Sequence, residues 1–273
     1  MDTLRLSHLE QTAYFAALRQ GVHILDAERV SQLLRVSRPH AVNLLASMAR
    51  KGALHRVGRG QYVVIPSDVL YQRRSYVADP YQVVDELMKG DGGPDYYVAY
   101  QSAALVHGAA YQLPQALLVA VPSQRRAISL GNSQILFVQV RPEKFFGYQE
   151  TTYHGSFFQV SDREKTILDC LDRFDLCGGI EEVARTTSSL VTQADADRLL
   201  AYLPRMRNQA LTQRLGLILE RLAGQQAISD RLLDGLAAQV GRHVYSLDPH
   251  GPADGPVHPR WRIRENIAPA EET

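Results

Sequence analysis

A chain of 273 residues is long enough for two domains with buried cores, and an apolar fraction of 45% excludes an intrinsically disordered protein. The longest apolar runs, such as Leu117–Val121, are far shorter than a membrane span, and two cysteines, Cys170 and Cys177, are too few for a disulfide framework or a zinc site. Met1 precedes a polar segment rather than a basic and then apolar leader, so we expect a cytoplasmic protein.

The net charge of +1 hides an asymmetry along the chain. Residues 1–75 contain 11 Lys and Arg against 5 Asp and Glu, which gives +6, whereas residues 76–273 carry −5. A basic first quarter joined to an acidic remainder is typical of a protein whose first part meets a polyanion. Because arginines on a solvated face give the same count, the helical pattern has to decide between these interpretations.

The first 35 residues predict two helices joined by a short strand. Apolar residues recur at helical spacing from Ser7 to Arg19, with Leu9 expected on the inner stripe. Residues 22–24 read as a short strand. Asp26 is a good N-cap for a second helix that continues to Arg35.

A third helix follows at once, and Ser37 is placed to cap it. Val42, Leu45 and Ala49 are expected to face the core because they recur at helical spacing. The opposite face then carries His40, Asn43 and Ser47, with Arg38 at the N-terminal end. Such side chains reach base edges when the start of a recognition helix enters the major groove.

A β-hairpin is predicted immediately after this helix. Residues 53–57 and 61–65 have strand composition, and Gly58-Arg59-Gly60 between them supplies the turn. Helix, turn, helix and basic hairpin in this order are typical of a winged helix-turn-helix. We expect Arg38, His40 and Asn43 to read bases. The candidate DNA-binding residues are Arg35, Ser37, Arg38, His40, Asn43, Ser47, Lys51, Arg56 and Arg59, of which Arg35, Lys51, Arg56 and Arg59 are expected to hold phosphates.

A mixed α+β domain is predicted over residues 76–273, after a connection at 67–79. Helical stretches are expected at 83–88 and 101–107, and strands at 96–100, 117–121, 135–140 and 157–160. The final third is helical, with segments at 162–174, 181–190, 195–202 and 209–223. The fold class is therefore α+β, with a winged-helix domain at 1–75.

No catalytic constellation is apparent in this second domain. Asp162, Glu164 and Lys165 lack the spacing of a nuclease metal site, and Ser161-x-x-Glu164 is better explained as a capping box. His107 ends a helix, where a backbone partner is expected. Phosphate-binding glycine loops, a serine elbow and a metalloprotease pattern are all missing. We predict no enzymatic activity, no cofactor and no metal.

The chain ends with a basic aromatic segment at 258–264. Trp261 and Ile263 alternate with arginines, which predicts a strand with its apolar face against the body. A basic tail that touches DNA is the alternative.

Several longer segments form a recognisable set. The chain has Arg-Val-Gly-Arg-Gly-Gln-Tyr at 56–62 and Ser-Ala-Ala-Leu-Val-His-Gly at 102–108, with Leu-Pro at 113–114. Val-Ser-Asp-Arg-Glu-Lys-Thr-Ile-Leu-Asp follows at 160–169, Gly-Gly-Ile-Glu-Glu-Val at 178–183, and Arg-Leu-Gly with Leu-Glu-Arg-Leu at 214–222. Over nearly the whole chain this set resembles the AbiEi-type antitoxins of bacterial type IV toxin–antitoxin systems, and Glu-Lys-Thr-Ile-Leu-Asp is its most specific part.

The resemblance implies a repressor that regulates its own operon by binding repeated operator half-sites in double-stranded DNA. It also implies that the C-terminal region neutralises a nucleotidyltransferase-like toxin without a stable complex. No heptad zipper is present, so we expect a monomer or a weak dimer that assembles on DNA. Two alternatives stay open: an enzyme delivered to DNA by its winged helix, and a stand-alone transcription factor whose second domain senses a ligand or a protein.

Overall fold

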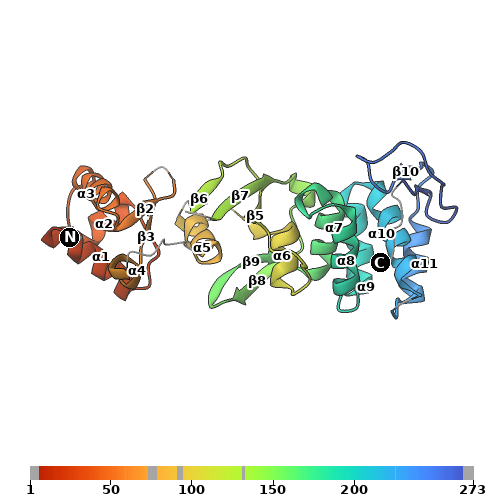
Figure 1. Cartoon of the computed structure of the whole chain (residues 1–273), viewed down its shortest axis with the longest axis horizontal. Coiled ribbons are helices and arrows are strands. Elements are labelled where there is room, and N and C mark those ends of the chain that lie inside the picture. Colours follow the sequence, from red (N-terminus) through yellow and green to blue (C-terminus); the bar gives the residue numbers. More distant parts are fainter. Residues whose placement is uncertain are drawn as a thin grey trace. The chain divides into compact units, whose positions relative to one another are not determined.

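The structure is a computed structural model that describes residues 6–58, 60–72, 79–90, 95–130, 133–224 and 226–266 (Figure 1). Two compact units are present. The first comprises residues 1–96, 115–138 and 151–158, and the second comprises residues 97–114, 139–150 and 159–273. The described part of the chain confirms a mixed α+β fold. The boundary predicted between residues 75 and 76 lies outside the described residues and stays a prediction.

The first unit begins with helices that pack on a small antiparallel sheet of order β1-β3-β2. Its elements up to residue 90 are α1 (His8–Arg19), β1 (Ile24–Leu25), α2 (Ala27–Leu34), α3 (Arg38–Arg50), β2 (Leu54–Arg56), β3 (Tyr62–Val64), α4 (Ser67–Gln72) and α5 (Pro80–Gly90). A core of buried side chains, Tyr14, Leu25, Leu45 and Met48 among them, joins α1 and α3 to this sheet. Because burial of these apolar side chains is favourable, the hydrophobic effect fixes which face of each helix points toward the sheet.

A larger sheet has the strand order β6-β7-β5-β4-β9-β8. Its strands are β4 (Tyr97–Val98), β5 (Leu117–Val121), β6 (Ile128–Leu130), β7 (Ser133–Gln139), β8 (Tyr148–Tyr153) and β9 (Ser156–Ser161). The pair β4 and β9 is parallel, and the pair β6 and β7 is antiparallel. All five residues of β5 are buried, as expected for a strand whose sequence is continuously apolar.

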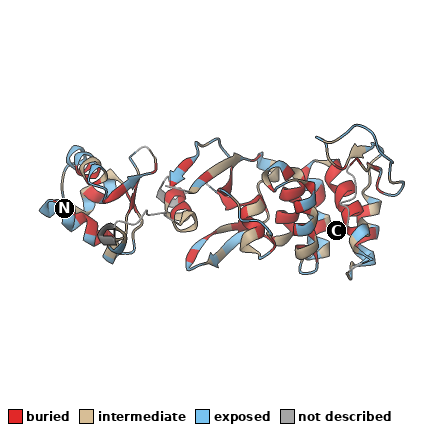
Figure 2. Cartoon of the chain, viewed as in Figure 1, coloured by how far each residue is buried: buried red, intermediate tan, exposed pale blue. Residues whose placement is uncertain are grey.

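The second unit is mainly helical. Its helices are α6 (Tyr100–Val106), η1 (Pro142–Lys144), α7 (Arg163–Asp172), η2 (Phe174–Leu176), α8 (Ile180–Val191), α9 (Ala196–Met206), α10 (Gln209–Leu222) and α11 (Asp230–Ala238). Two short parallel strands, β10 (Tyr245–Ser246) and β11 (Ile263–Arg264), follow. Helix α7 packs against α6, α8, α9 and α10, and Figure 2 shows it almost wholly buried. Trp261 and Ile263 are also fully buried, which confirms their predicted inward orientation.

Several expected details of the chain are wrong. Leu9 and Val42 are 38% and 48% exposed, although Ala13, Ala16 and Ala17 of α1 and Leu45 of α3 are buried as expected. In α3 the inner face runs through Ala41, Leu44, Leu45 and Met48 and so leaves Val42 outside it. The N-cap of α7 is Asp162 rather than Ser161, since Asp162 accepts a hydrogen bond from the Lys165 N–H at 2.7 Å while Ser161 still belongs to β9. The expected connection at 67–79 includes α4, and α11, β6 and β8 were not anticipated.

Candidate nucleic-acid interface

Helices α2 and α3 are separated by only three residues. Asp26 caps α2 as predicted by accepting a hydrogen bond from the Arg29 N–H at 2.8 Å. The helix ends at Arg35, which has a left-handed backbone (φ 54°) and is exposed. A positive φ reverses the chain sharply, so α3 begins two residues after Val36 and packs directly against α2.

Helix α3 has one apolar and one polar side. Ala41, Leu44, Leu45 and Met48 are buried, at positions i, i+3, i+4 and i+7. The exposed side chains include Arg38, His40 and Asn43, three residues that were predicted to read bases. Val42 adds an exposed apolar side chain to this helix, which is compatible with contact to a thymine methyl group.

Ser37 occupies the N-cap position of α3, as predicted, but its side chain makes no capping hydrogen bond. Pro39 stands within the first turn, where its missing N–H costs nothing because early helical N–H groups lack intrahelical partners. No acidic side chain lies in this first turn. The positive end of the helix dipole is therefore not neutralised by α3 itself, which favours an anion there.

The other end of α3 is tied to α1 through a buried carboxylate, Glu10. The Lys51 ammonium bonds to Glu10 at 2.6 Å, and the Ser47 hydroxyl and the backbone and side chain of Ser7 also bond to it. Burial alone would raise the pKa of Glu10, but these hydrogen bonds outweigh it and lower the pKa to about 2. Lys51 and Ser47, both predicted to meet DNA, thus hold α1 against α3.

The signal for Glu10 was present in the sequence and was overlooked. Ser7 and Glu10 form a reciprocal capping box at the start of α1. The Ser-x-x-Glu pattern at a helix start predicts that arrangement. The pattern does not reveal that Lys51, at the end of α3, is the partner of Glu10, because Lys51 lies 41 residues away along the chain.

The hairpin after α3 has the register expected of a tight turn. Leu54 pairs with Val64, His55 with Val63 and Arg56 with Tyr62. Arg56 is exposed, and its Nε donates to the Gly58 carbonyl at 3.3 Å. Arg59, predicted at the tip, lies outside the described residues.

The central segment of the second unit builds a buried polar cluster rather than an open site. The Lys165 ammonium is fully buried, pairs with the Asp169 carboxylate and donates to the Tyr97 hydroxyl at 3.1 Å. Asp162 accepts a hydrogen bond from the Tyr202 hydroxyl at 2.8 Å. A buried charge needs such partners, so these polar residues link α7 to β4 and α9.

Glu164 and His107 also have structural partners. The Glu164 carboxylate accepts a hydrogen bond from the Asp195 N–H at 2.5 Å and pairs with Arg198 at 3.6 Å. The His107 Nε2 lies 2.7 Å from the Ser161 carbonyl oxygen, which confirms the expected backbone partner. Burial lowers the pKa of His107 and so keeps the ring neutral, in which state Nε2–H is the donor.

Two features are absent from the described residues. No group of three or more His, Cys, Asp or Glu side chains is placed there to hold a metal ion. No helix in the same part of the chain is both long and apolar enough to cross a membrane.

Residues 96–221, which run from β4 to α10, match the AbiEi antitoxin C-terminal domain. This segment therefore has the character of an AbiEi antitoxin C-terminal domain, and the match confirms the resemblance seen in the sequence. An AbiEi antitoxin domain at residues 96–221 supports the role of an antitoxin in a toxin–antitoxin system.

A solved structure with a similar fold is the RV2827C protein from Mycobacterium tuberculosis. The two share 15% sequence identity with a TM-score of 0.72, over 95% of this chain and 92% of that one. At this identity the likeness concerns the fold alone. The comparison with curated proteins gives no significant match.

Proposed function

We propose that the chain is a sequence-specific DNA-binding repressor of its own toxin–antitoxin operon, with α1 to β3 acting as a winged helix-turn-helix. The observation that carries the proposal is the exposed row of Arg38, His40 and Asn43 on α3, next to a helix start without acidic side chains. The three-residue connection from α2 fits a helix-turn-helix, in which the second helix enters the major groove.

Charge supports the same surface. Residues 1–75 carry +6, and attraction to phosphates supplies most non-specific binding to DNA. Arg35 and Arg56 are exposed and suited to phosphate contact. Lys51 is the weakest candidate of this kind, because its ammonium already neutralises Glu10 and would have to share its charge.

Two measurements distinguish residues that read bases from residues that hold phosphates: the affinity for promoter DNA of the protein's own gene compared with unrelated duplex, and the salt dependence of that affinity. Arg38→Ala or Asn43→Ala should weaken binding to the operator about 5- to 150-fold with little effect on unrelated duplex. Arg56→Ala should weaken binding to every duplex and reduce the slope of log affinity against log salt by about one.

Arg19→Ala is the matched control, because Arg19 is an exposed arginine of α1 outside the proposed surface. It should leave operator affinity within about twofold of wild type. The proposal fails if the full chain binds no promoter fragment at low salt, or if Arg38→Ala and Arg19→Ala behave alike.

We further propose that the toxin it counteracts is nucleotidyltransferase-like and is neutralised without a stable complex. Support comes from the family match at residues 96–221. Co-expression with a nucleotidyltransferase gene found beside its own should restore growth, while the two proteins elute separately in gel filtration. Growth arrest that persists at high levels of this chain would contradict the proposal.

A further inference from the structure

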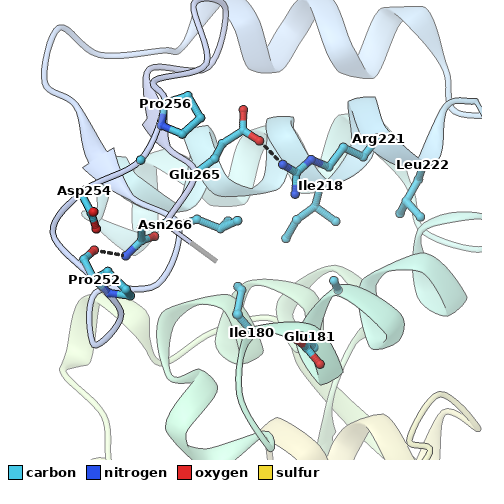
Figure 3. Close-up of a pocket in the computed structure, with 13 residues that line it drawn as sticks. Ile180, Glu181, Ile218, Arg221, Leu222, Pro252, Asp254, Pro256, Glu265 and Asn266 are labelled. Atoms are coloured by element: carbon cyan, nitrogen blue, oxygen red, sulfur yellow. Dashed lines mark hydrogen bonds and ion pairs between the residues drawn. The ribbon is translucent and has the colours of Figure 1, made fainter. Parts of the chain in front are cut away.

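A cavity of about 580 Å³ lies in the second unit, between two helices and the C-terminal loop (Figure 3). Such a volume lies within the range of sites that hold small organic ligands. Its lining is mostly apolar and comes from α8, α10, residues 247–256 and residues 265–266. The apolar lining includes Ile180, Ala184, Ile218, Leu222, Leu247 and Pro256.

The loop wall of this cavity is held in place by specific contacts. The buried Asn266 amide donates to the carbonyls of Asp248 and Pro252, and its oxygen accepts from the Asp248 N–H. A side chain at Gly255 would collide with the Glu265 carbonyl, so the loop can lie this close to the neighbouring segment only with glycine there. A wall fixed in this way preserves an open cavity, which lowers the cost of binding.

Acidic side chains surround the apolar lining. Arg221 and Glu265 form an ion pair at the edge, so their charges cancel (Figure 3). Glu181 and Asp254 also line the cavity, and neither forms an ion pair or a side-chain hydrogen bond within the described residues. The cavity therefore has an apolar interior and two uncompensated carboxylates at its exposed margin.

We propose that this cavity binds a small organic cation with an apolar body, such as an aromatic or branched amine. The apolar part would shield Ile180, Ile218 and Leu222 from water, and the cationic group would pair with Glu181 or Asp254, which lie on different walls of the cavity (Figure 3). An anionic ligand of the same shape would meet like charge. This site is independent of the DNA interface, and no DNA contact is needed to test it.

Three probes of nearly equal shape test the charge preference on the full chain by ligand-observed NMR: tryptamine, tryptophol and indole-3-propionate. Tryptamine should bind with a Kd on the order of 1 mM, as expected for so small a ligand. Tryptophol should bind more weakly, and indole-3-propionate about tenfold more weakly than tryptamine. Equal binding of all three probes, or binding of none, overturns the proposal.

Variants of the lining residues test whether the probes bind in this cavity. Glu181→Gln with Asp254→Asn should abolish the preference for tryptamine over tryptophol, whereas Glu150→Gln, an exposed carboxylate outside the lining, should preserve it. Ala184→Phe should fill the cavity and remove binding of every probe. Thermal unfolding followed by Trp261 fluorescence checks that each variant is folded. If Ala184→Phe unfolds, the double variant Glu181→Gln with Asp254→Asn is the test. A preference for tryptamine over tryptophol that is unchanged in this double variant would overturn the proposal.

Discussion

The buried carboxylate of Glu10 gives the sharpest test of how the first unit is held together. Glu10→Gln removes the charge but retains an acceptor for the Ser7 N–H, since Gln also completes a capping box. The substitution therefore removes the part of these contacts that depends on the charge of Glu10, in which the ion pair with Lys51 is the largest contribution.

The magnitude follows from the pKa of the carboxyl group, which falls from 4.5 to about 2 on folding. A fall of this size corresponds to at most about 3 kcal/mol of stability. Because the Lys51 side chain is 36% exposed, solvent screens part of this contribution, and we expect about 1–2 kcal/mol. The folded pKa lies below the unfolded one, so the contribution is fully present above pH 4.5 and is lost as pH falls toward 2.

Amide hydrogen exchange of α1 and α3 in the full chain measures this difference at each pH. Glu10→Gln should lower the free energy of opening by about 1–2 kcal/mol at pH 7, and the difference from wild type should shrink below about 0.5 kcal/mol at pH 2. Glu28→Gln, an exposed carboxylate of α2, should stay within about 0.5 kcal/mol of wild type at both pH values. A Glu10→Gln effect that is equal at pH 7 and pH 2 would refute the ionic explanation.

The second unit offers two further predictions, both measured by urea unfolding with the single Trp261 as the fluorescent reporter. Gly216→Ala should destabilise the unit by about 1–3 kcal/mol, because the added Cβ would overlap the buried indole ring, whereas Gly224→Ala, with open space around it, should be neutral or slightly stabilising. Lys165→Met should cost about 3–5 kcal/mol since it leaves Asp169 buried without its cation, and Asp169→Leu in the same chain should recover part of that loss. Unchanged unfolding midpoints would contradict the packing and the ion pair respectively.

Local sequence determined where most elements of the chain begin and end. Asp26 caps α2 because its carboxylate can accept from a nearby N–H three residues on, and β5 covers Leu117–Val121 as a continuous apolar run predicts. Such features depend on residues a few positions apart. They can be inferred without knowing the rest of the fold.

Burial of polar groups is different, because it depends on partners that are distant in sequence. The sequence marks Lys165 as a charged residue beside a helix cap, yet it is fully buried between Asp169 and Tyr97. Small errors of helical phase have the same origin. Val42 has the spacing of a core residue, but the inner face of α3 is set by contact with α1 and the sheet, and Val42 is exposed.

Composition, local spacing and motifs carry the mixed α+β class, the basic first quarter and the likeness of residues 96–221 to an antitoxin domain, so these could be inferred before the fold was known. Which distant groups become neighbours depends on the tertiary structure, which pairs Lys51 with Glu10 and places Glu181 and Asp254 on different walls of one cavity. Lys51 and Glu10, which are 41 residues apart, come together only when helices pack, since packing fixes which groups lose water and which partners replace it.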